Sequence, residues 1–205
     1  MTSPKLTKVS FMASPGLILL GWAVMRAMGT EGREPGWTIG HVLWLSGYLL
    51  VGVACVALYR MIVAARPTVR PVAGAVLVVA GVGTACLVVQ MVIDLVAGFA
   101  TSTVGDKNAF TDEIQAVPGI LPLVYQWGPV LMFTALLAQT IHAAMARCVP
   151  AIAAVLVGAS VLTMAGDRLV DTPIRLTMGV AAAVLWIAFA IVARGRTGSP
   201  AVATR

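Results

Sequence analysis

The sequence predicts an all-α polytopic membrane protein, a bundle of six transmembrane helices with both termini in the cytoplasm. Hydrophobic residues make up 60% of its 205 residues and charged residues only 11%, so one soluble core cannot bury the apolar surface. Six apolar stretches reach the roughly 20 residues that cross a bilayer. The basic residues stand in short clusters beside these stretches, which is typical of topology signals and not of a nucleic-acid site.

The predicted spans lie at about 11–29, 39–60, 72–99, 119–146, 149–169 and 174–193. Lys5 and Lys8 precede the first stretch and Arg26 interrupts its end, so we expect a retained first helix and not a cleaved signal peptide. The chain then divides into a cytoplasmic N-terminal segment, one transmembrane domain and a disordered cytoplasmic tail, at 1–10, 11–193 and 194–205.

The charges predict the orientation in the cell membrane. With the N-terminus inside, nine of the 14 Lys and Arg residues fall on the cytoplasmic side, as the positive-inside rule requires. All eight acidic residues then fall at or near the outer face: Glu31, Glu34, Asp94, Asp106, Asp112, Glu113, Asp167 and Asp171. Acids contribute little to topology, so their one-sidedness indicates that the outer face carries the chemistry.

Two breaks in the apolar pattern predict local structure. In the longest loop we expect a turn at 105–108 and a short interfacial helix at 111–117, stopped by Pro118. In the fourth span, Pro129 cannot donate a hydrogen bond to the carbonyl of Tyr125, so we expect a kink there. A free carbonyl inside the membrane must face protein or a cavity.

Asp94 is the most informative residue, because it lies inside the third predicted span. A carboxylate there costs on the order of 2.5–3.5 kcal/mol, so it should face protein or water. Gln90 lies one turn away on the same helical face. Two interpretations remain open. Asp94 is a functional acid, or it pairs with Arg26 or Arg168 as a buried tie between helices.

Further polar and aromatic residues would surround this acid. Asp94 and Asp167 are the predicted catalytic residues, since two carboxyl groups in one vestibule can divide donor and acceptor roles; for Asp167 the alternative is a solvated ion-pair cluster. His41 heads a stripe with Trp44 and Tyr48, and for it a solvated or capped histidine is weighed against a catalytic one. The predicted substrate-binding residues are Trp44, Tyr48, Gln90, Tyr125, Gln126 and Trp127.

Several chemistries lack their usual motifs. The sequence has no HExxH, GxSxG, P-loop or DDxxD pattern and no clustered metal-ligand set. Its three cysteines, Cys55, Cys86 and Cys148, have no CxxC spacing. His41 and His142 are predicted at opposite sides of the membrane, so they cannot ligate one haem. We therefore expect no metal and no cofactor.

The leading functional hypothesis is an intramembrane enzyme that acts on a lipophilic small molecule by carboxylic-acid catalysis near the outer leaflet. One acid beside aromatic faces suits protonation of an alkene or epoxide and stabilisation of the carbocation, as in a cyclase or isomerase. Small membrane-bound terpene cyclases are similar in having few helices and intramembrane acids, although no motif here matches that family residue by residue. The alternatives are a small proton- or cation-coupled transporter or channel, and a non-catalytic membrane subunit; homo-oligomerisation is left open.

Overall fold

The structure, a computed structural model, describes residues 4–28, 35–166 and 176–195, and these are helical with no strand among them. The α-helices are α1 Pro4–Met28, α2 Gly36–Ala65, α3 Arg70–Ala100, α4 Val104–Gln115, α5 Gly128–Met145, α6 Ala151–Gly166 and α7 Leu176–Gly195. A 3-10 turn, η1 Pro67–Val69, joins α2 to α3, and a π-helix, η2 Ile120–Trp127, leads into α5. The all-α prediction is confirmed over these ranges.

Five helical segments are long and apolar enough to cross a membrane: Leu6–Met28, Gly36–Ala65, Pro67–Ala100, Ile120–Met145 and Leu176–Arg194. Large apolar side chains lie exposed on the outside of the bundle, among them Val78 at 67% and Leu162 at 73%. Such a surface fits lipid better than water. The sixth predicted span corresponds to α6, of which 16 residues are described. The six-span count and the orientation of the termini stay predictions.

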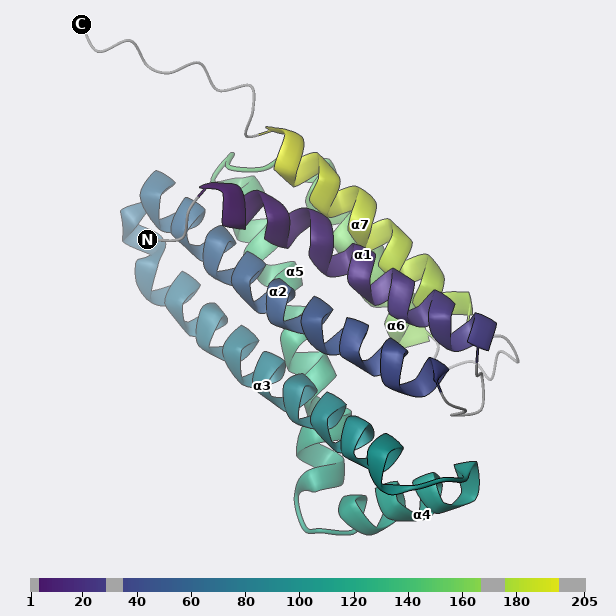
Figure 1. The fold of residues 1–205 in the computed structure, drawn as a ribbon. Coiled ribbons are helices and arrows are strands. Elements are labelled where there is room, and N and C mark those ends of the chain that lie inside the picture. Colours follow the sequence, from purple (N-terminus) through teal and green to yellow (C-terminus); the bar gives the residue numbers. More distant parts are fainter. Residues whose placement is uncertain (1–3, 29–34, 167–175, 196–205) are drawn as a thin grey trace, which may run out of the picture.

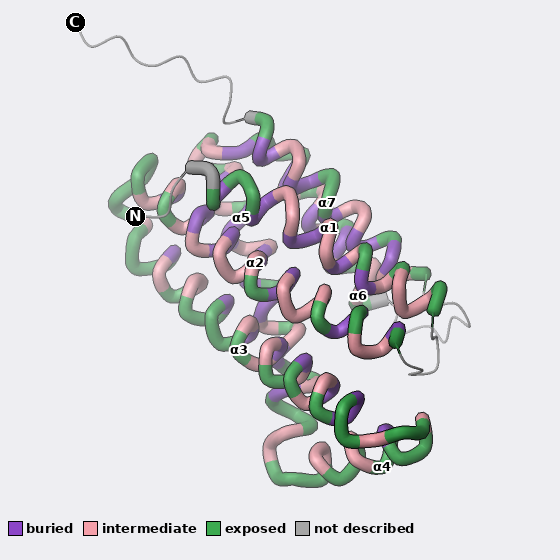
Figure 2. The backbone as a smooth tube through the Cα atoms, in the orientation of Figure 1, coloured by how far each residue is buried: buried purple, intermediate pink, exposed green. Residues whose placement is uncertain are grey.

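The helices form a ring with one helix outside it. Contacts run from α1 to α2, α2 to α5, α5 to α6, α6 to α7 and α7 back to α1. Within the ring, Phe11 of α1 meets Phe189 of α7 edge to face, with ring centroids 5.2 Å apart. Helix α3 lies outside the ring against α2 and α5 (Figure 1). Figure 2 shows the buried residues on the faces that the helices turn towards one another.

Glycines let α3 and α5 approach closely near mid-bundle. A Cβ atom added at Gly83 would overlap the backbone of Met132, and one added at Gly128 would overlap the Cβ atom of Cys86. Backbone packs directly on backbone here, as small residues permit between membrane helices. The seam between α3 and α5 is therefore closed in its middle.

The predicted turn at 105–108 is wrong, because these residues form the start of α4. Thr103 caps the helix: its Oγ1 accepts a hydrogen bond from the backbone N–H of Asp106 at 3.1 Å and donates to the Asp106 carboxylate at 2.8 Å. A capping threonine with a carboxylate three residues on starts a helix despite nearby turn-forming residues. The predicted interfacial helix thus begins well before residue 111.

The break before Pro129 takes the form of a π-helix. The N–H of Gly128 bonds the carbonyl of Leu123, five residues back. Pro129 then supplies no N–H at the point where the π-helix passes into α5. Gly119 precedes the π-helix with a φ of 91°, a conformation that glycine adopts without strain. Single π-turns are frequent at functional sites.

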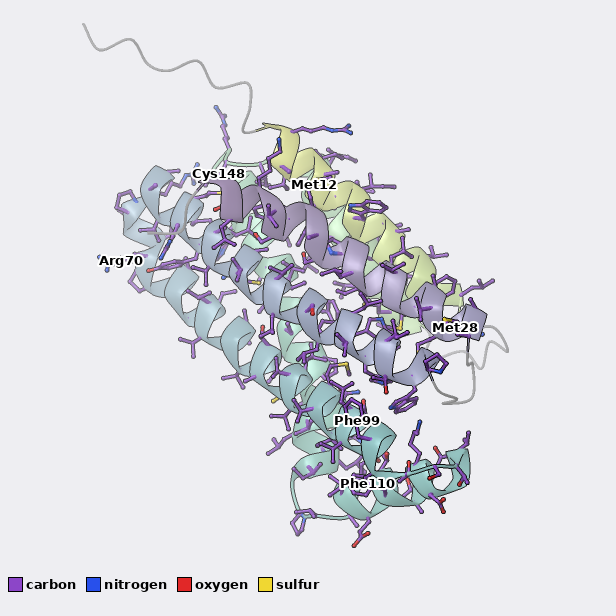
Figure 3. The ribbon with its side chains drawn as sticks, viewed as in Figure 1. Met12, Met28, Arg70, Phe99, Phe110 and Cys148 are labelled. Carbon is purple, nitrogen blue, oxygen red and sulfur yellow. The ribbon has the colours of Figure 1, made fainter. Side chains whose placement is uncertain are left out.

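The two ends of the bundle carry opposite charges. At one, here called the acidic end, lie the C-terminal part of α3 and all of α4, with the described acids Asp94, Asp106, Asp112 and Glu113. At the other, here called the basic end, lie the α2–α3 and α5–α6 connections with Arg60, Arg66, Arg70 and Arg147. Figure 3 labels Phe110 at the acidic end, and Arg70 and Cys148 at the basic end.

Candidate functional site

Asp94 lies near the acidic end of α3, with its side chain turned into the protein. It is buried, at 6% exposure. Its Oδ1 accepts a hydrogen bond from the hydroxyl of Tyr125 in η2 at 3.2 Å. Its Oδ2 lies 3.6 Å from Nε2 of His41 in α2, within ion-pair distance and slightly longer than a direct hydrogen bond. Each carboxyl oxygen therefore faces a protonatable side chain.

The imidazole of His41 has a defined tautomer. Its Nδ1 lies 2.7 Å from the main-chain oxygen of Trp37, and because a carbonyl oxygen can only accept, Nδ1 must carry a hydrogen. Nε2 is then the nitrogen that faces Asp94. This arrangement suits a proton on either member of the His41–Asp94 pair, as a protonated carboxyl group beside a neutral imidazole or as a carboxylate beside an imidazolium.

Two tryptophans of α2 hold the imidazole in place. The indole N–H of Trp37 donates to the main-chain oxygen of Asp94 at 2.7 Å, and its ring lies 4.1 Å from that of His41. Trp44 meets His41 edge-on at 5.1 Å and donates to the carbonyl of Ile18 in α1 at 2.9 Å. Positions 37, 41 and 44 share one helical face. The aromatic rings fix the orientation of His41 and offer π faces to a cation.

Helix α4 lies across the acidic end (Figure 1) and contacts α3 and η2. Lys107 of α4 is buried, at 3% exposure, with its Nζ 4.8 Å from the centroid of the Trp37 ring. Gln115, at the end of α4, is a hydrogen-bonding partner of Tyr125. One short helix thus touches both an aromatic wall of the site and the hydroxyl that binds Asp94.

The structure brings four of the predicted binding residues to this cluster. Trp44 and Tyr125 make the contacts given above. Tyr48 is buried two turns inward of His41 and interacts electrostatically with Asp94. Gln90 lies one turn inward of Asp94, and its buried Oε1 has no hydrogen-bond partner in the described part of the chain. The site thus continues inward along α2 and α3.

Other predicted site residues lie elsewhere. Gln126 and Trp127 are exposed on η2, Trp127 at 57%. Asp167 and Arg168 fall outside the described residues, so the two-acid arrangement stays a prediction. Arg26 stacks over Trp22 at 5.9 Å.

The ion pair of Asp94 is with histidine and not with Arg26. One terminal nitrogen of Arg26 is buried with no hydrogen-bond partner among the residues described. His41 lies beside the Asp94 carboxyl group, where one interpretation of the sequence expected an arginine. The partner of the carboxyl group is therefore an imidazole, a side chain that can act as a proton donor or acceptor.

Three contributors were not among the predicted site residues: His41, Trp37 and Lys107. The spacing of Trp37 and His41, four residues apart above Trp44, was a usable signal, because it extends the aromatic stripe by one turn. The burial of Lys107 had no such signal, since its segment was expected to be a turn.

Within the described ranges, no three His, Cys, Asp or Glu side chains gather as a metal site would require. No protein-family model, curated protein or solved structure matches the chain. Function therefore has to be argued from the geometry of the His41–Asp94 pair and its surroundings.

Proposed function

We propose that the protein is an intramembrane enzyme that uses the His41–Asp94 pair as proton donor and acceptor for a lipophilic molecule at the acidic end. One observation carries this proposal: both oxygens of a buried carboxyl group face protonatable side chains, His41 at 3.6 Å and Tyr125 at 3.2 Å. An intramembrane acid is a functional-site hypothesis by default. Here the acid is also oriented, as general acid–base catalysis requires.

The proposed chemistry is isomerisation or cyclisation through a carbocation. Asp94 gives its proton to one carbon of an alkene, which forms a C–H bond and leaves the positive charge on the neighbouring carbon. An adjacent carbon then loses a proton to the Asp94 carboxylate, so the product is an isomer and the site is regenerated. The faces of Trp37 and Trp44 suit stabilisation of the cation. With an epoxide, the proton would go to oxygen as the C–O bond breaks.

Proton- or cation-coupled transport is the second candidate. Gln139 favours it, because this fully buried side chain has neither its oxygen nor its nitrogen paired within the described residues. It follows Met132 by seven residues and so lies on the α3-facing stripe of α5. The close contact of Gly83 with Met132 lies between Gln90 and Gln139. Transport along this seam would require α3 and α5 to separate, which enzyme chemistry at the acidic end does not require.

Deuterium uptake tests the proposal directly. Protein in lipid nanodiscs would be incubated in D2O with squalene or geranylgeraniol, and deuterium in the recovered lipid measured by mass spectrometry. We expect one deuterium per turnover with the native chain. Asp94→Asn should lower the rate by about 100-fold or more, the usual size of a general-acid contribution. Arg70→Gln, exposed at the basic end, is the control and should leave the rate unchanged.

Two results would contradict the enzyme. Undiminished deuterium uptake by Asp94→Asn would remove the acid from the reaction. Proton flux in proteoliposomes that depends on Asp94, without deuterium uptake by any lipid, would replace catalysis with transport.

A further inference from the structure

A groove of about 540 Å³ runs between α2 and α3. It extends from Leu49 and Val89, nearer the acidic end, to Val56 and Leu77. Its lining is apolar apart from the Thr84 hydroxyl and the Cys55 thiol, and Thr84 already donates to the carbonyl of Ala80 at 2.7 Å. The groove therefore suits hydrocarbon and offers almost nothing to a polar headgroup.

Small residues make the groove deep. Gly52, Ala80, Gly81 and Ala85 contribute to its lining. A Cβ atom added at Gly81 would meet no atom within 4 Å, so this part is open. The volume lies within the roughly 300–1,000 Å³ typical of small-molecule sites.

The groove and the His41–Asp94 pair lie along the same two helices. On α3, Asp94 follows Val89 by five residues, and on α2, His41 precedes Leu49 by eight. At a rise of 1.5 Å per residue these intervals are about 8 and 12 Å along the helix axes. A molecule whose chain lay in the groove would need a further segment of about that length, beyond Leu49 and Val89, to come level with the pair.

We propose that this groove binds the hydrocarbon chain of the substrate and so presents its reactive group to the His41–Asp94 pair. The substrate class is a lipid with a long alkyl or isoprenoid chain and an alkene or epoxide near one end. This inference rests on the proposed function. A second copy of the chain is the weaker occupant, because the volume of about 540 Å³ is that of a small-molecule site and its lining lies on the same two helices as the His41–Asp94 pair.

Photolabelling tests the occupant. Protein in nanodiscs would be irradiated with a long-chain alkane that carries a diazirine, and the labelled peptides mapped by mass spectrometry. We expect adducts concentrated at 49–56 and 77–89. Gly81→Leu fills open space and should lower labelling there by about tenfold, the effect of a few misplaced methylenes in an apolar site. Val78→Leu, on the exposed face of α3, is the matched control and should change nothing.

Two outcomes would overturn the groove assignment. One is even labelling of all the lipid-facing helices, which indicates bulk lipid only. The other is efficient disulfide cross-linking of Gly81→Cys between two copies, which indicates an interface. Thermal unfolding of Gly81→Leu, expected to match that of the native chain, shows that lost labelling reflects a filled groove.

Asp94→Asn separates this inference from the proposed function, since it should leave groove labelling intact while it abolishes deuterium uptake. Specific labelling without any deuterium uptake would support the groove as a hydrocarbon-binding site and contradict the proposed enzyme function. Even labelling together with Asp94-dependent uptake would mean the reverse.

Discussion

The acidic and basic ends of the bundle use charge in opposite ways. At the acidic end, His41, Asp94 and Lys107 are buried, at 3%, 6% and 3% exposure. At the basic end the arginines are exposed, and no acidic residue is described beside them. An exposed charge stays solvated at little cost in free energy, and exposed basic residues of this kind act as topology signals. Buried charge is stable only with partners, so the acidic end is where the chain has built specific geometry.

The basic end still has one constrained residue. Arg147, two residues after the end of α5, has a φ of 57°, a left-handed conformation that glycine usually provides. The N–H of Cys148 bonds the carbonyl of Ala143 at 2.8 Å, which closes the helix end. An arginine here places a cation at the negative end of the helix dipole. The one constrained residue at this end is therefore also an exposed cation.

Breaking the buried pair should have the largest effect on stability. Asp94→Ala leaves His41 buried without its partner and should lower the free energy of unfolding by about 3–5 kcal/mol. Arg70→Gln, at the basic end, should change it by less than about 0.5 kcal/mol, as surface substitutions usually do. Denaturant unfolding in detergent micelles measures both. Equal effects would mean that the two ends do not differ in the way described.

Substitution of two neighbouring glycines of α3 separates its packed face from its open face. Gly83→Ala forces a methyl group against the backbone of Met132 and should cost about 1–3 kcal/mol. Gly81→Ala enters open space and should be neutral or stabilising by up to about 1 kcal/mol, because alanine favours the helix. Thermal unfolding of the Gly83→Ala and Gly81→Ala variants measures the two effects. A similar loss in both would contradict the closed α3–α5 seam.

Removal of one hydroxyl should have a smaller effect. Tyr125→Phe deletes the hydrogen bond to Asp94 and should cost about 1 kcal/mol. Tyr59→Phe, from the half-buried tyrosine of α2 near the basic end, is the control and should cost less. If the two losses were the same, the Tyr125 hydroxyl would not be a specific partner of the acid.

The smallest expected effect concerns Cys148 at the basic end, whose thiol donates to the carbonyl of Met61 at 3.4 Å. Burial raises the pKa of Cys148, and nearby Arg66 partly offsets this. A raised pKa means less thiolate at a given pH, so alkylation by iodoacetamide near neutral pH should be slower than for free cysteine and should rise with pH. Arg66→Gln should slow it further. Mapped alkylation rates faster than those of free cysteine would contradict this.

The sequence predicted the helical class and the inward position of Asp94, because long apolar runs and a lone acid inside one of them have few alternatives in a membrane. It did not predict the partner. Arg26 and Arg168 were named as possible partners by charge and depth, but the partner depends on how each helix is rotated, and the contact of α2 with α3 brings His41 to Asp94. Gln126 lies exposed on η2, and its role in substrate binding stays a prediction.

We expect His41 and Asp94 to exchange a proton through Nε2 of His41, because Nδ1 faces the main-chain oxygen of Trp37. Nitrogen NMR of ¹⁵N-histidine-labelled protein in nanodiscs tests it, with His41→Gln to separate the signals of His41 from those of His142. Nδ1 should stay protonated through a pH titration, only Nε2 should gain and lose its proton, and Asp94→Asn should change the midpoint. A neutral His41 with its hydrogen on Nε2, or a titration that Asp94→Asn leaves unchanged, would contradict it.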